Sequence, residues 1–428
     1  MRFAVPSIIM MIFTSIYSVV DGFFISNFVG ETEFAAVNFI FPFLMIFDSV
    51  GFMLSTGGAA YVSLLLGQGK EEKANKAFSM LVYVAIGVGV AIGVLLEIFI
   101  RPVAVLLGAE GEMLEYAVLY GQVICVTAPA FTLQYTFQSF FVAAERPRLG
   151  LAFTVAAGVS NMILDWLFMA VFNWGVVGAA VASCIGQVIG GVGPLIYFAT
   201  KNSSLLGLCK TKFEWYTLKK TCSNGVAELV TNASMSLVNM VYNIQLLKFA
   251  GESGVAAYGI IMYLNFVFVS AFIGYTMGTA PIISFNYGAE TYPELKNVST
   301  KSRIIIYSGS VLAVVLAEVF ATPLAAIFAG YDPEFLELSV HALRLYSYCY
   351  LFTGINVFTS GFFAALNNGK ISAFLSLLRM LVFQLLSVII IPIFLGTDGI
   401  WISMLVAEAG TAILTFITLK KYSKQYHY

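Results

Sequence analysis

Residues 77–100 read AFSMLVYVAIGVGVAIGVLLEIFI, and Glu97 is the one charged residue among them. A run of about 20 apolar residues is long enough for an α-helix to cross the hydrocarbon core of a bilayer, which is about 30 Å thick. A charged side chain is expensive in that core, so its near absence matters as much as the length. The stretch therefore predicts a transmembrane helix and, with it, an integral membrane protein.

The rest of the chain has the same character. Its 428 residues are 60% hydrophobic and only 11% charged, and the mean hydropathy is +0.90. So little polar surface does not cover a soluble globule. The apolar runs that are long enough to span lie at approximately 3–26, 34–66, 77–100, 113–143, 151–172, 176–199, 222–249, 254–285, 303–329, 335–366, 371–396 and 399–419. We therefore predict an all-α polytopic membrane protein of about twelve transmembrane helices, with no room for a separate catalytic domain.

The positions of Lys and Arg predict the orientation. Cytoplasmic loops carry the excess of these residues, and 18 of the 22 in this chain fall in one alternating set of connections or in the tails. They are Arg2, Lys70, Lys73, Lys76, Arg146, Arg148, Lys201, Lys210, Lys212, Lys219, Lys220, Lys296, Lys301, Arg303, Lys370, Lys420, Lys421 and Lys424. Both termini are thus expected on the cytoplasmic side of the plasma (inner) membrane.

An internal repeat with an offset of roughly 220 residues divides the chain. Phe141-Val142-Ala143-Ala144 matches Phe362-Phe363-Ala364-Ala365, and Gly175-Val176 opens one predicted helix as Gly399-Ile400 opens another. Leu66-Gly67-Gln68-Gly69 is likewise matched to Phe285-Asn286-Tyr287-Gly288. Each half holds six predicted helices, so the halves share one orientation in the membrane. We predict an N-terminal lobe at 1–200, a basic cytoplasmic linker at 201–221 and a C-terminal lobe at 222–428.

Two carboxylates and an amide lie inside predicted spans of the first half. Asp21 lies in the first span, and Asn161 and Asp165 lie four residues apart on one face of the fifth. Their oxygens are hard ligands that suit a Na⁺ ion, and two acids in one low-dielectric site can instead share a proton. The other interpretation is that they hydrogen-bond to neighbouring helices and stabilise packing. The repeat places no carboxylate pair at the matching positions of the second half, which favours a specialised cation site.

The second half has charged residues of its own in predicted spans, namely Glu228, Arg379 and Glu408. We predict that they face the substrate cavity. Glu228 lies near the predicted start of its helix, where the helix dipole also favours an acid. Arg379 is expected either to pair with Glu228 or Glu408 or to extend towards the Lys370 side.

Several motifs together resemble the multidrug and toxic compound extrusion (MATE) family, and the resemblance runs along the whole chain. They include Pro6, Gly67-Gln68-Gly69, Asn161-Met162-Ile163-Leu164-Asp165, Gly175-Val176-Val177-Gly178-Ala179-Ala180 and Ala280-Pro281-Ile282-Ile283-Ser284-Phe285-Asn286-Tyr287-Gly288. The resemblance implies an antiporter that exports organic, often cationic, compounds by rocking two six-helix lobes around a central cavity.

The resemblance also implies roles for particular residues. The family's cation site in the first lobe falls on Asp21, Asn161 and Asp165, and Ser183 stands where the family commonly carries a Thr hydroxyl. Tyr17 and Tyr120 fit further positions of that site. Some members use an acidic pair in the second lobe instead, and Glu228 matches its first member without an acidic partner on the tenth helix.

The alternatives differ in the chemistry that they need. A lipid-linked saccharide flippase of the related superfamily remains open, although its pyrophosphate substrate needs a cationic cavity and the charges placed here are mainly acidic. A membrane enzyme is not supported, since the chain has two His and no metalloprotease or hydrolase motif. We expect no cofactor and no metal beyond H⁺ or Na⁺ as the coupling ion. The expected partners are organic small molecules and membrane lipid, with no nucleic acid, and the chain is expected to be a monomer.

Overall fold

The computed structural model describes residues 2–29, 31–106, 109–330 and 332–428, and these ranges contain helices and no β-strand. The first half forms α1 (Ala4–Phe28), α2 (Glu31–Gly67), α3 (Glu71–Leu106), α4 (Gly111–Val126), α5 (Ala128–Ala143), α6 (Pro147–Asp165), the π-helical turn η1 (Trp166–Val171) and α7 (Gly175–Ala199). Each of the first six predicted spans coincides with one of these helices or with a pair of them. The all-α prediction is confirmed.

The second half follows the same order. It forms α8 (Trp215–Gly288), α9 (Tyr292–Val319), α10 (Ala321–Ala329), α11 (Pro333–Ser347), α12 (Tyr350–Ala365), α13 (Gly369–Leu377), the π-helical turn η2 (Leu378–Phe383) and α14 (Gln384–Tyr426). Two of these helices are each a pair of spans, because Gly251 and Gly396 adopt positive φ (64° and 60°) and break them. The predicted boundaries at 249–254 and 396–399 fall at these breaks.

Eight helical stretches of the described chain are long and apolar enough to cross a membrane, and the α4–α5 pair, bent by 61° at Thr127, makes a ninth. One of the eight, Gly369–Tyr426, contains the break at Gly396 and so covers two predicted spans. The predicted span 222–249 is helical too but carries polar residues such as Glu228. The predicted span 335–366 is divided between α11 and α12, which are each shorter than a full span. The fold is that of a multi-pass membrane protein.

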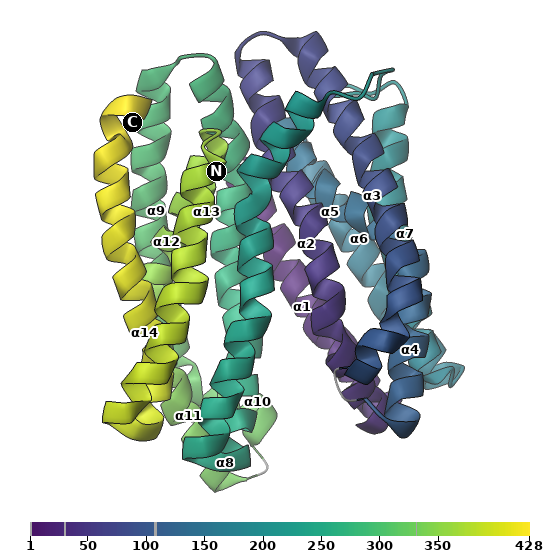
Figure 1. Ribbon diagram of the computed structural model, residues 1–428, viewed down its shortest axis with the longest axis vertical. Coiled ribbons are helices and arrows are strands. Elements are labelled where there is room, and N and C mark those ends of the chain that lie inside the picture. The colour runs from purple at the N-terminus through teal and green to yellow at the C-terminus, as the bar shows by residue number, and fades with distance from the viewer. Residues whose placement is uncertain (1, 30, 107–108, 331) are drawn as a thin grey trace.

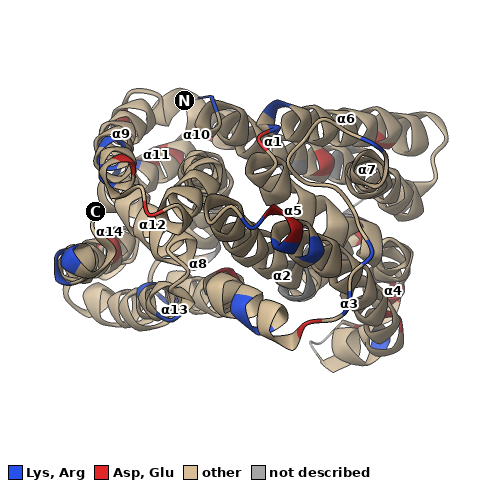
Figure 2. Ribbon diagram, turned by 90° about the horizontal axis from the view of Figure 1, so that it is seen from above, with Lys and Arg blue, Asp and Glu red and all other residues tan. Residues whose placement is uncertain are grey.

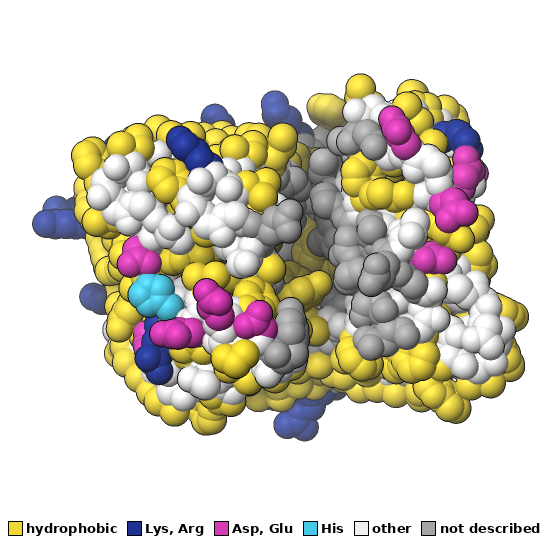
Figure 3. All heavy atoms as spheres, turned by 90° about the horizontal axis from the view of Figure 1, so that it is seen from below, with side chains coloured by type: hydrophobic (Ala, Val, Ile, Leu, Met, Phe, Trp, Pro, Cys, Tyr) yellow, Lys and Arg dark blue, Asp and Glu magenta, His cyan; other side chains and the backbone are white. Residues whose placement is uncertain are grey.

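The helices form two bundles that lie side by side (Figure 1). The helices from α1 to α7 make one bundle, those from α9 to α14 the other, and α8 runs along the boundary between them. Both termini lie towards the same end of the molecule. Seen from that end, the ribbon carries Lys and Arg positions on several of its helices and loops (Figure 2), whereas Asp and Glu side chains predominate over Lys and Arg on the opposite face (Figure 3).

Glycines bring the two bundles into backbone contact near the Lys-rich end. A Cβ atom on Gly57 would lie 2.1 Å from the carbonyl oxygen of Thr221, and one on Gly225 would lie 2.0 Å from that of Met53. Closer to the helix ends, a Cβ atom on Gly67 would lie 2.0 Å from the carbonyl oxygen of Phe285. No side chain fits at such distances, so α2 and α8 meet along a seam of glycines.

The glycine contacts between α2 and α8 follow the internal repeat. Gly288 meets Leu64 of α2 as Gly67 meets Phe285 of α8. Gly67 and Gly288 are also the last residues of their helices, so they are equivalent. The sequence match that set Gly67 against Asn286 was therefore two residues out of register. An Asn367 side chain reinforces the seam, because its Nδ2 donates to Ser284 Oγ (3.2 Å) and that hydroxyl donates to the Ala60 carbonyl of α2.

At the acidic end the molecule is hollowed along the line between the two bundles (Figure 3). The bundles therefore touch near the Lys-rich end and part at the other. The described chain thus has a hollow at its acidic end and close backbone packing at its Lys-rich end.

Candidate functional site

The first-lobe candidate residues come together where α1, α6 and α7 meet. Asn161 Nδ2 lies 3.4 Å from Asp165 Oδ1 and also 3.4 Å from Ser183 Oγ of α7. The carboxyl groups of Asp21 and Asp165 interact directly with each other. Asp165 is fully buried and Asn161 is 3% exposed. The structure thus assembles four of the six predicted cation-site residues into one buried polar cluster.

Small residues allow the three helices to approach so closely. A Cβ atom on Gly158 of α6 would lie 2.6 Å from the Phe13 ring of α1, and one on Gly186 of α7 would lie 3.2 Å from the Asn161 Cβ atom. Asp165 is the last α-helical residue of α6 and the π-helical turn η1 follows it. Such turns insert an extra residue into a helix and are frequent at functional sites.

The cluster holds more acceptors than donors. Asp21 Oδ1, Asn161 Oδ1 and Asp165 Oδ2 are buried and have no hydrogen-bond partner among the residues that the structure describes. A buried acceptor that lacks a donor is costly. These three oxygens, one from each of the two carboxyl groups and one from the Asn161 amide, fit a cation ligated by oxygen or a shared proton. The described residues contain no group of three or more His, Cys, Asp or Glu that suits a metal ion.

The two predicted tyrosines lie at different distances from this cluster. Tyr17 packs on α6, because its ring carbon Cδ1 is 3.2 Å from where a Cβ atom on Gly158 would lie. Tyr120 of α4 is 4% exposed and belongs to a hydrophobic cluster with Met169 and Ala180, on the segments that follow Asp165 and precede Ser183. Tyr17 thus packs against α6 at Gly158, three residues before Asn161, whereas Tyr120 packs in a hydrophobic cluster.

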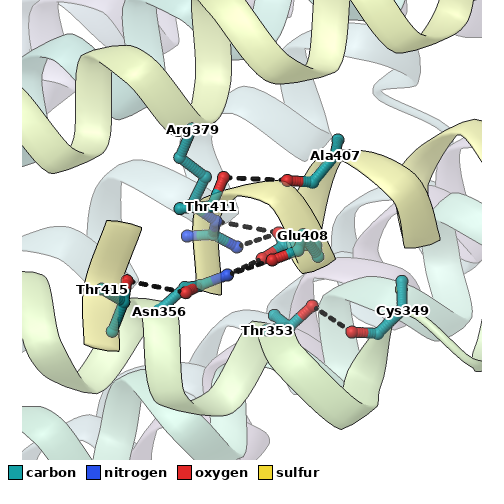
Figure 4. Close-up of polar contacts among 8 residues, drawn as sticks. All are labelled: Cys349, Thr353, Asn356, Arg379, Ala407, Glu408, Thr411 and Thr415. Atoms are coloured by element: carbon teal, nitrogen blue, oxygen red, sulfur yellow. Dashed lines mark hydrogen bonds and ion pairs between the residues drawn. The ribbon is translucent and has the colours of Figure 1, made fainter. Parts of the chain in front are cut away.

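In the second lobe the structure pairs Arg379 with Glu408 (Figure 4). Arg379 Nη2 lies 2.7 Å and Nε 2.8 Å from Glu408 Oε1. Asn356 Nδ2 donates to Glu408 Oε2 (2.7 Å), and the Thr415 hydroxyl donates to Asn356 Oδ1 (2.9 Å). Of the three positions that the sequence left open for Arg379, the structure selects the pairing with Glu408. The Glu408 side chain is 0% exposed and that of Arg379 is 13% exposed, so the pair is largely buried in this conformation.

Glu228 is not part of the Arg379–Glu408 ion pair. The Arg379 guanidinium nevertheless lies close enough to act on it electrostatically. The expectation that Glu228 sits near the start of its helix is wrong. Helix α8 begins at Trp215, so Glu228 is more than three turns inside and the helix dipole does not explain it. The helix therefore begins inside the predicted linker, before its apolar run. Its first turns carry Lys219 and Lys220.

Sequence reasoning did not single out Asn356 or Thr415, which complete the second-lobe network. Asn356 lies in the apolar run Tyr350–Ala365, and an amide in a membrane helix is a usable signal because it must find a partner. Thr415 gives no such signal, since a Thr in a helix commonly bonds to its own backbone.

Comparison with known proteins places these features in a family. The model of the MatE family matches residues 6–167 and again residues 229–390, which confirms the internal repeat. The multidrug export protein MepA of Staphylococcus saprophyticus is 26% identical over 97% of this chain and 92% of its own length. MepA of Staphylococcus haemolyticus is 25% identical over 97% of this chain and 91% of its own.

Two solved structures share the fold. One is described as the outward-facing conformation of a multidrug resistance MATE family transporter, with a TM-score of 0.95 and 22% identity over 99% of this chain and 95% of that one. The other, a MOP superfamily transporter from Pyrococcus furiosus, has a TM-score of 0.94 and 21% identity over 100% of this chain and 96% of that one. With its helices, its repeat and its full-length relatives all in agreement, this chain belongs to the MATE family.

Proposed function

We propose that this protein is an H⁺- or Na⁺-coupled antiporter that exports organic, cationic or amphipathic small molecules across the plasma membrane. The observation that carries the proposal is the first-lobe cluster, in which Asp21, Asn161 and Asp165 each keep one buried oxygen without a donor among the described residues and the two carboxyl groups interact. The relatives, which are multidrug export proteins, support the export of drug-like molecules over the flipping of a lipid-linked saccharide.

The proposed cycle follows from charge balance. Two carboxyl groups that face each other in a low-dielectric site are stable with one proton or one monovalent cation between them. Loading that ion from the acidic end and releasing it at the Lys-rich end would favour opposite arrangements of the lobes. The exported compound then moves the other way, because the same two arrangements present the central cavity to either side.

The orientation belongs to the same proposal. The Lys-rich end, where the glycine seam closes the lobes, faces the cytoplasm by the positive-inside rule. Both termini lie towards this end (Figure 1). The hollow between the lobes then opens to the outside, so the described conformation is outward-facing.

The direct experiment is dye efflux from vesicles that contain the purified protein. A Na⁺ gradient and a pH gradient are imposed separately on the same preparation. We expect one of the two to drive efflux and its dissipation by an ionophore to stop it. Efflux that needs neither gradient would contradict the proposal.

A milder change tests the neutral ligands of the cluster. Asn161→Ala removes the amide that lies between Asp165 and Ser183 but keeps both carboxyl groups. We expect the concentration of coupling ion at half-maximal efflux to rise about tenfold, the usual cost of losing a group that positions a ligand, with little change in the maximal rate. Asn297→Ala, at an exposed position of α9, is the control. An unchanged ion dependence in Asn161→Ala would remove Asn161 from the site.

A further inference from the structure

Glu408 is a buried carboxylate whose oxygens already have donors. Both Nε and Nη2 of Arg379 reach Oε1, and Asn356 Nδ2 reaches Oε2 and also the backbone carbonyl of Glu408 (2.9 Å) (Figure 4). Asn356 is itself fixed by Thr415 from the same helix as Glu408. Each member of this network is therefore satisfied and held in place by another.

The two lobes thus treat a buried acid in opposite ways. In the first lobe Asp21, Asn161 and Asp165 each keep a buried oxygen without a hydrogen-bond partner among the described residues. In the second lobe neither carboxylate oxygen of Glu408 is among such atoms. An acceptor without a donor is open to an exchangeable ion, whereas one that already receives a guanidinium is not.

We propose that Arg379 is a resident cation of the second lobe. Its guanidinium occupies the place beside Glu408 that an exchangeable ion would take, and this confines ion coupling to the first-lobe cluster. The inference rests on the proposed coupling function and adds a residue that decides which lobe responds to the ion. Arginine suits the role because its side chain stays charged and binds a carboxylate through two N–H groups at once.

The pair has no counterpart in the first lobe. The two family matches begin at residues 6 and 229, and at this offset Arg379 corresponds to Ala156. Glu408 lies beyond the second match, and the pairing of Gly175 with Gly399 sets it against Cys184. A role in scaffolding common to both lobes would place related residues at both positions. The pair therefore belongs to what distinguishes the second lobe from the first.

The surroundings of Glu408 contain other groups that titrate. Glu228 and Tyr242 of α8 and Cys349 at the start of α12 lie close enough to act electrostatically on Arg379 or Glu408. Arg379 itself lies in η2, the π-helical turn between α13 and α14. The experiment must therefore isolate Glu408 from these neighbours.

The first arm uses transport. In Arg379→Gln/Glu408→Gln both charges are removed together and no lone buried charge is left. We expect this double variant to export dye at the wild-type rate with the wild-type ion dependence. If it is folded and yet loses gradient-driven efflux, the pair takes part in coupling and the inference is overturned.

The second arm does not depend on transport and therefore separates this inference from the proposed function. It measures the thermal unfolding midpoint of purified protein in detergent, with and without NaCl and across pH. All variants carry Asp165→Asn, so that the first-lobe cluster does not respond. We expect Arg379→Gln to make the midpoint shift with the ion that Glu408 now binds, and Arg379→Gln/Glu408→Gln to remove that shift although Glu228 is still present.

The outcomes of the second arm are decisive in either direction. A midpoint in Arg379→Gln that responds to ions no more than that of Asp165→Asn alone overturns the inference, even if coupled transport is confirmed. If Arg379→Gln does not fold, the efflux of the double variant in the first arm decides, because loss of gradient-driven efflux there overturns the inference. Arg379→Lys keeps a tethered cation and is expected to show no new ion dependence.

Discussion

Asp165→Asn is expected to abolish gradient-driven efflux while the protein still inserts and folds. The amide has nearly the size of the carboxyl group and keeps an acceptor oxygen, so the contact with Asn161 Nδ2 can persist. It has no negative charge and takes no proton. The cluster would then hold one carboxylate, Asp21, and the balance of two acids and one ion that we propose as the coupling element would be lost.

The measurement is dye efflux under the gradient that drives the wild-type protein, with expression and gel-filtration profile as checks of folding. Asp21→Asn should give the same loss, because the two carboxyl groups interact directly. The control is Asp398→Asn. Asp398 is about half exposed and pairs with His341 at 2.8 Å, so its charge is not buried and its loss should leave efflux unchanged. Wild-type efflux in Asp165→Asn would exclude the first-lobe cluster from coupling.

Hydropathy could predict the number and order of the helices because a helix that crosses lipid needs a long apolar run. It could not predict where α8 begins. Hydropathy reports which residues contact lipid, and the first turns of α8, with Lys219 and Lys220, are helical outside that zone. Because the helix start could not be predicted, the sequence also predicted Glu228 too near the start of α8.

More of the candidate site could be predicted from the sequence in the first lobe than in the second. Asn161 and Asp165 share one helix face by their spacing alone, but their meeting with Asp21 and Ser183 depends on how α1 and α7 pack on α6. In the second lobe the partner of Arg379 could not be chosen from sequence. A long side chain reaches several neighbours, and the rotation of each helix decides among them. In the structure Arg379 pairs with Glu408 Oε1, and Asn356 donates to the other carboxylate oxygen, Oε2.

Gly57→Ala is expected to stop export by a different route, because it acts on the closure of the lobes. The added Cβ atom would lie 2.1 Å from the Thr221 carbonyl oxygen and 2.7 Å from the Gly225 backbone nitrogen. Backbone atoms cannot rotate away as a side chain can, so α2 and α8 must separate near the Lys-rich end. The described arrangement, which is closed at this end, would lose stability relative to arrangements in which this end is open.

The shift can be measured as a distance between spin labels at Glu112 of α4 and Glu334 of α11, which are exposed positions in the first turns of helices in opposite lobes. The labels are attached to cysteines in a background that lacks the five native ones. We expect Gly57→Ala to shift the distance distribution away from that of the described conformation and to lose efflux. The control is Gly87→Ala, at a helical glycine of α3 with nothing within 4 Å of an added Cβ. It should leave both readouts unchanged and stabilise the helix by about 0.5–1 kcal/mol.

The repeat supplies a second glycine for which a smaller effect is expected, because Gly278 corresponds to Gly57 as Gly288 corresponds to Gly67. Gly278 of α8 faces the first turn of α1, and a Cβ atom there would lie 2.8 Å from the Ala4 Cα atom. That contact is less severe, and the first turn of a helix can move more easily than the middle of one. Gly278→Ala should therefore shift the labels less than Gly57→Ala does. Equal effects, or wild-type distances in Gly57→Ala, would mean that the glycine seam does not control the closure of the lobes.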